Sequence, residues 1–143
     1  MSVLAVAGLM VGLMSAASPA SASPSCTKNL LTTTRSGWIV AVPAASSSTP
    51  LHCHLQQGYV GAAVRTLQNS IAWCYRGYNE TVLKITVDGN FGPKTKAALK
   101  RVQQIEGVTA DGVYGPQTRD AMKHRQVAWE GDQDPNVCRE LSW

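Results

Sequence analysis

The stretch DGNFGPKT at residues 88–95 returns as DGVYGPQT at residues 111–118, which is a period of 23 residues. Each copy continues into a short amphipathic segment, at residues 98–100 in the first copy and 121–123 in the second. A repeat of this length is typical of one supersecondary unit used twice, because neither unit can bury its apolar face alone. The sequence therefore predicts two loop-helix units that share one core.

The helices are predicted from apolar spacing around this repeat. A first stripe at helical spacing ends near Trp73 and comprises Val60, Ala63, Val64, Leu67 and Ile71. A second stripe, capped by Gly107, comprises Ala98, Leu99, Val102 and Ile105. Pro93 and Pro116 each open a helix, because a fixed φ and a missing N–H suit the first helical position. We therefore expect an all-α fold, a three-helix bundle with a short third helix.

The remaining sequence suggests four segments. Residues 1–22 carry no charge, contain an apolar run and end in Ala-Ser-Ala, as a signal peptide does. No Lys or Arg precedes that run, so either the true start lies upstream or the segment is not a signal, with an N-terminal membrane anchor as the main alternative. Residues 23–50 form an arm and linker with a small predicted β-hairpin over residues 32–42. Residues 51–126 form the bundle, and residues 127–143 an irregular tail.

The cysteines and the charge limit where the protein acts. The four cysteines are Cys26, Cys53, Cys74 and Cys138, an even number beyond the predicted signal. In an exported chain they predict two disulfides, in any of three connectivities, which tie the arm and the tail to the core. The formal charge of +4 is too spread out for a nucleic-acid footprint. It suits an anionic surface such as a bacterial envelope, or serves solubility.

The repeated loop has a physical explanation in each copy. An Asp side chain accepts hydrogen bonds from backbone N–H groups just ahead, and the next Gly supplies a positive φ. The aromatic residue drops between helices, and a Thr hydroxyl serves the first helical turn. On this account the loops only build the fold. The alternative is that the two loops frame a shallow groove, with backbone donors and Tyr114 facing a ligand.

These motifs resemble the peptidoglycan-binding-like domain over roughly Leu51 to Lys123. The residues that carry the resemblance are Gly61, Val64, Leu67, Gln68, the two Asp-Gly-x-aromatic-Gly-Pro-x-Thr stretches, Gln103 and Gly107. The resemblance implies a three-helix module that binds peptidoglycan without catalysis, as it does when attached to wall hydrolases and carboxypeptidases. Two departures are Cys74, where the family has an ordinary apolar residue, and the lack of an accompanying enzyme domain.

The expected binding residues come from the repeated loops and the first helix. They are Arg65, Gln68, Asp88, Gly89, Phe91, Asp111, Gly112, Tyr114 and Thr118. An Arg fork matches the carboxylate of a peptidoglycan stem peptide, and recognition of the glycan is the equal alternative. We expect a secreted, wall-associated monomer with no cofactor, no nucleic-acid partner and no stable membrane insertion.

Other kinds of site are weighed and set aside. His52, His54 and His124 suggest zinc, but Cys53 is expected in a disulfide and a thiolate ligand must be reduced. Residues 132–136 imitate a calcium loop, but the Gly and the bidentate Glu of such loops are missing. No catalytic residue is predicted, because neither Glu80 nor Glu106 has an evident partner.

The alternative function is a secreted accessory or inhibitor that binds a cell-wall enzyme. A large exposed apolar patch that includes Trp38 or Trp129 would favour it. Stacking on sugar faces is a further role for Trp38, Trp129 and Trp143, although buried structural tryptophans are the more common case.

Overall fold

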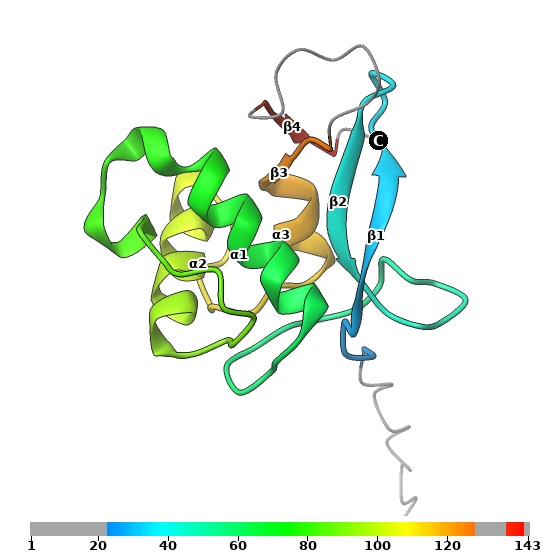
Figure 1. Cartoon of the computed structure of the whole chain (residues 1–143), viewed down its shortest axis with the longest axis horizontal. Coiled ribbons are helices and arrows are strands. Elements are labelled where there is room, and N and C mark those ends of the chain that lie inside the picture. Colours follow the sequence, from blue (N-terminus) through cyan, green and yellow to red (C-terminus); the bar gives the residue numbers. More distant parts are fainter. Residues whose placement is uncertain (1–22, 128–136, 142–143) are drawn as a thin grey trace, which may run out of the picture.

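The computed structural model describes residues 23–127 and 137–141 (Figure 1). Its elements in chain order are β1 (Lys28–Thr33), β2 (Ile39–Ala44), α1 (Ala62–Cys74), two 3₁₀ turns (Arg76–Tyr78 and Thr81–Leu83), α2 (Pro93–Ile105), α3 (Pro116–Ala121), β3 (Lys123–Arg125) and β4 (Cys138–Glu140). The predicted signal peptide, the calcium-like turn, Trp129 and Trp143 lie outside the described residues. None of the helices described is long and apolar enough to cross a membrane.

The expectation of an all-α fold is wrong. Beside its helices the described chain contains two antiparallel sheets, β1–β2 and β3–β4. Helix α1 packs against both β2 and β3, so the sheets belong to the packed structure and are not an appendage. In Figure 1 the β1–β2 hairpin runs along one side of the helices.

The irregular tail is also corrected, because residues 138–140 form β4. The strands β3 and β4 have three residues each, with the sequences KHR and CRE, so neither shows an apolar alternation that marks a strand. Their pairing depends on distant partners instead. Gln126 donates its N–H to the Val137 carbonyl at 3.0 Å, and Val127 donates to Ile39 of β2 at 2.9 Å.

The predicted hairpin is confirmed and is longer than expected. Its register runs from Lys28 opposite Ala44 to Thr33 opposite Ile39. Val40, Val42 and Ala44 alternate along β2 and are all fully buried, which is the pattern of a strand with one face toward the core. The turn closes through Gly37, whose φ of +85° suits a residue without a Cβ.

The helix starts predicted from the repeat are confirmed. Pro93 and Pro116 stand at the first positions of α2 and α3, each after a glycine in extended backbone conformation. Gly107 has a φ of +70° just beyond the end of α2. Val60 differs from the prediction, because it precedes α1, pairs with Asn90 and is 75% exposed.

One core joins both copies of the repeat. Phe91 from the first loop and Tyr114 from the second lie in the same buried cluster as the apolar faces of α1 and α2. The segment 55–61 runs across both loops. Leu55 exchanges two backbone hydrogen bonds with Tyr114 at 2.9 Å, and Phe91 donates its N–H to Tyr59 at 2.9 Å.

Two disulfides fasten the ends of the chain to this core, as expected. Cys26 is bonded to Cys53, which joins the arm to the start of the helical part. Cys74 at the end of α1 is bonded to Cys138, which holds β4 in place. The connectivity that the sequence left open is therefore 26–53 and 74–138. Restricting the unfolded chain in this way is typically worth about 2–4 kcal/mol per bridge.

Candidate functional site

A buried glutamine holds the first loop in shape. The Gln68 amide nitrogen donates to Asp88 Oδ1 at 2.8 Å, to the Asn90 carbonyl at 3.0 Å and to Thr95 Oγ1 at 3.1 Å. Its oxygen accepts the Gly89 N–H at 2.7 Å. Since Gln68 is fully buried, these bonds satisfy its amide, which water does not reach.

A second glutamine repeats this arrangement in the second loop. The Gln103 amide nitrogen donates to Asp111 Oδ1 at 2.8 Å, to the Val113 carbonyl at 3.0 Å and to Thr118 Oγ1 at 2.9 Å. Its oxygen accepts the Gly112 N–H at 2.8 Å. Each loop is therefore clamped by a glutamine from the helix before it. We call these two hydrogen-bond sets the glutamine clamps.

The expected binding residues divide into two groups. Three are exposed, namely Arg65, Asp88 and Asp111. Six are buried, namely Gln68, Gly89, Phe91, Gly112, Tyr114 and Thr118. Within the second group, Tyr114 is only 1% exposed, and its hydroxyl has no hydrogen-bond partner among the described residues. This placement differs from the expectation that Tyr114 faces a ligand. The buried group supports the loops from inside.

The first loop borders a surface groove of about 380 Å³. We call it the first-loop groove, and its lining residues are Ile85, Thr86, Asp88, Asn90, Gly92, Pro93, Lys94 and Thr95. The Asn90 N–H donates to the Asp88 carboxylate at 2.8 Å. This bond, followed by the one from Gln68, lowers the pKa of the Asp88 carboxyl below its ordinary value. The groove thus combines a carboxylate, an amide, hydroxyls and an ammonium group.

Basic side chains lie over both loops. Arg65 donates to the carbonyls of Val87 at 3.2 Å and Asp88 at 3.1 Å, and its guanidinium lies 3.3 Å from the place where a Cβ on Gly89 would stand. In the second copy, Lys96 and Lys100 take this place over Gly112. Long basic side chains from the preceding helix therefore lie against both Asp-Gly pairs, through the guanidinium in the first copy and through the side-chain carbons of the lysines in the second.

The residues considered for zinc lie in other surroundings. Cys53 is in a disulfide. His54 Nε2 is 2.9 Å from the Tyr59 hydroxyl, and His124 Nε2 is 2.7 Å from the Arg119 carbonyl. No group of three metal-ligating side chains gathers within the described part of the chain.

Three residues of the site were not predicted from the sequence as binding or loop-supporting residues, although Gln103 is among those that carry the family resemblance. Gln103 was missed as a clamp because it precedes its Asp by 8 positions, whereas Gln68 precedes its Asp by 20. The 23-residue period therefore hides the equivalence of the two glutamines. Asn90 and Lys94 sit at variable positions inside the quoted repeat, and the repeat itself was the only signal for them.

Comparison with known proteins relates the helical part of the chain to a family. Residues 60–122 match the model of the family described as "Putative peptidoglycan binding domain", so this part of the chain belongs to that family. Both glutamine clamps lie inside the matched segment.

Individual relatives match parts of the chain. The zinc D-Ala-D-Ala carboxypeptidase of Streptomyces albus G is 44% identical over 54 residues, which are 38% of this chain. The match spans about a fifth of that relative, at 20% of its length. The N-terminal domain of SleB shares 34% identity over 46% of this chain and 81% of its own, with a TM-score of 0.38. A peptidoglycan-binding protein from Clostridioides difficile shares 22% identity over 59% and 58%, with a TM-score of 0.40.

Proposed function

We propose that the chain binds bacterial peptidoglycan without catalysing a reaction on it. The observation that carries this proposal is the family match at residues 60–122, which coincides with the clamped loops. The binding module is proposed to span residues 51–126 and to act as a secreted monomer at the cell wall. The two disulfides are consistent with an extracellular location.

The first-loop groove is the proposed contact surface. Asp88, held ionised by its hydrogen bonds, accepts from sugar hydroxyl or peptide N–H groups. Asn90 and Lys94 supply donors on either side, and Arg65 adds a cation at the edge of the loop. The buried clamp fixes this surface before the ligand arrives, which reduces the entropy lost on binding.

The rival function, docking to a cell-wall enzyme, gains no support from Trp38. This side chain is 38% exposed, and the Arg139 guanidinium covers one face of its ring at 4.5 Å. The ring is therefore part of a local cation–π pair within the hairpin and tail strands. We retain peptidoglycan as the proposed ligand.

Sedimentation with purified sacculi tests the proposal. The native protein is expected in the pellet, and Asn90→Ala is expected to sediment several-fold less. Asn90 suits this test because its side chain is exposed, while the clamp uses only its backbone. Gln117→Ala, an exposed position of the second loop, is the matched control and is expected to sediment like the native protein.

Two results would contradict the proposal at different levels. Native protein that stays in the supernatant at low salt would remove peptidoglycan binding altogether. Equal sedimentation of Asn90→Ala and native protein, with both folded by circular dichroism, would move the contact surface away from the first-loop groove.

A further inference from the structure

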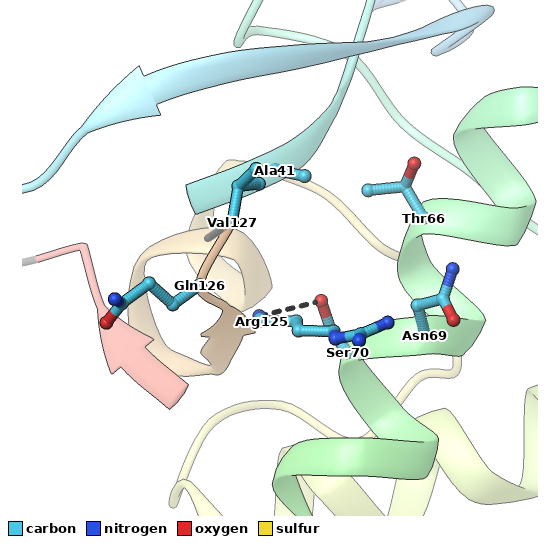
Figure 2. Close-up of a pocket in the computed structure, with 7 residues that line it drawn as sticks. All are labelled: Ala41, Thr66, Asn69, Ser70, Arg125, Gln126 and Val127. Atoms are coloured by element: carbon cyan, nitrogen blue, oxygen red, sulfur yellow. Dashed lines mark hydrogen bonds between the residues drawn. The ribbon is translucent and has the colours of Figure 1, made fainter. Parts of the chain in front are cut away.

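A second pocket lies where α1 meets the two sheets. Its volume is about 300 Å³, and we call it the junction pocket. The lining residues are Thr66, Asn69 and Ser70 from α1, Ala41 from β2, and Arg125, Gln126 and Val127 from β3 and the residues after it (Figure 2). Four of these seven residues lie outside the family match at residues 60–122. This pocket therefore depends on the strands that are added to the matched domain.

Arg125 gives the pocket a positive charge that forms no ion pair with any carboxylate of the described residues. Its guanidinium stacks on the Trp73 ring at 4.7 Å, and Arg76 stacks on the same ring at 4.9 Å. The ion pairs found among the described residues are Arg101 with Glu80 and Arg119 with Asp120, and neither involves Arg125. A half-buried guanidinium stacked in this way keeps its N–H edge available for an anion.

The polar groups beside Arg125 come from one face of α1. The buried Ser70 hydroxyl accepts the Arg125 backbone N–H at 3.4 Å, which positions the strand against the helix. Asn69 lines the pocket, and its amide makes no hydrogen bond to another described residue. Figure 2 shows the Arg125 side chain extending from the strand toward α1, where Asn69 and Ser70 lie. A guanidinium and a free amide therefore border the same space.

We infer that the junction pocket binds the free carboxylate at the end of a short peptide. Arg125 and Asn69 supply N–H donors for the two carboxylate oxygens. Ala41 and Val127 offer apolar surface for one small side chain, and about 300 Å³ is at the lower end of volumes for ligand pockets. The choice of a peptide carboxylate rests on the proposed binding of peptidoglycan, whose stem peptides carry such groups.

A titration of the whole, disulfide-bonded chain tests the inference. The probes are N-acetyl-alanyl-alanine in its L,L and D,D forms, and the corresponding C-terminal amides. At least one free acid is expected to shift the backbone amide signals of residues 66–70 and 125–127 in a saturable way. Its amide is expected to bind at least tenfold more weakly, because the amide carries no charge for Arg125.

Three variants assign the effect to the pocket. Arg125→Gln and Asn69→Ala are each expected to weaken binding of the acid, by tenfold or more for the arginine. Arg76→Gln is the matched control, because Arg76 stacks on the same Trp73 ring but does not line the pocket. Within the described part of the chain Asn69→Ala removes no hydrogen bond, so it tests the pocket even if Arg125→Gln fails to fold.

The inference is overturned if acid and amide bind alike, if no acid binds saturably, or if Asn69→Ala and folded Arg125→Gln both bind as native protein does. Sacculus sedimentation separates this failure from that of the proposed function. Native protein that sediments but binds no probe would support peptidoglycan binding and contradict the assignment of the junction pocket as a carboxylate site. Native protein that binds the acid but does not sediment would retain the junction pocket as a carboxylate site and contradict peptidoglycan binding.

Discussion

The two repeated loops are alike inside and different outside. Inside, each has a buried glutamine with four hydrogen bonds, a buried aromatic ring and a glycine at positive φ. Outside, the exposed Asn90 and Lys94 of the first loop are replaced by Val113 and Gln117 in the second. The fold therefore constrains the inner residues of both copies equally. The outer residues are free to differ, so within the repeat a binding function is sought among them.

The copies also differ in how their helices end. Helix α2 has 13 residues and is followed by a loop that begins near Gly107, whereas α3 has six residues and is followed directly by β3. The second copy is thus joined to the sheets, and the first is not. This difference places His124 and its buried ring beside the second copy only.

The largest expected loss of stability comes from breaking either glutamine clamp. Gln68→Ala and Gln103→Ala each leave a buried glycine N–H without its acceptor and remove the three hydrogen bonds that the glutamine amide donates, at a cost of about 3 kcal/mol in the free energy of unfolding. Urea unfolding at pH 7 with the disulfides intact measures it. The exposed Gln57→Ala is the control. A large loss at one clamp and none at the other would end the claim that the two loops share one scaffold.

Lowering the pH is expected to destabilise the folded chain through His124, which lies beside the second copy of the repeat. Burial lowers the pKa of His124 to about 4, from 6.5. Since the unfolded chain then binds a proton that the folded chain does not, the free energy of unfolding falls as the pH drops from 6.5 to 4, by about 3 kcal/mol. Equilibrium unfolding across this range measures the slope. His124→Gln should remove most of that slope, and an unchanged slope would show that other groups cause it.

Alanine at the loop glycines should give a smaller and similar loss in both copies. Gly89 and Gly112 have φ values of +79° and +76°, so Gly89→Ala and Gly112→Ala should each cost about 1–2 kcal/mol. Urea midpoints compare them with Gly77→Ala, where a Cβ meets nothing within 4 Å. If neither loop variant is less stable than the control, the loops do not require their left-handed backbone.

The smallest losses of stability are expected from the basic side chains over the two loops, and the two variants should differ in binding to sacculi. Arg65 and Lys100 occupy equivalent positions over Gly89 and Gly112. Arg65→Ala removes two hydrogen bonds to carbonyls and should cost about 1 kcal/mol, whereas exposed Lys100→Ala should stay within about 0.5 kcal/mol. Only Arg65→Ala should reduce sedimentation with sacculi. An equal reduction for Lys100→Ala would mean that net charge, not the first loop, attracts the wall.

The sequence predicted the parts of the fold that repeat or have a period. The Gly-Pro pairs placed the starts of α2 and α3, and the β-prone residues at 32–34 and 38–42 placed the hairpin. The strands β3 and β4 had no such signal, because they are short, polar and held by a disulfide and remote backbone bonds. The sequence allowed two positions for Tyr114, in the core if the loops only build the fold and at the surface if they frame a groove. Only the tertiary packing decides between them.

The sites were less predictable than the fold for a similar reason. The junction pocket brings together Ala41, Ser70 and Arg125, which are far apart in the sequence and belong to no common motif. The clamp at Gln68 joins residues 20 positions apart across a loop of 3₁₀ turns, so no local pattern indicates it. Such sites arise from tertiary packing and not from periodicity.

The most direct test is the map of backbone amide shifts when soluble muropeptides are added to the native chain. The account predicts that the shifts within the repeat concentrate at residues 85–95, in the first-loop groove, and leave the equivalent residues 108–118 almost unchanged. Shifts of equal size in both loops, or in the second loop alone, would contradict the claim that one of two identically built loops carries the binding surface.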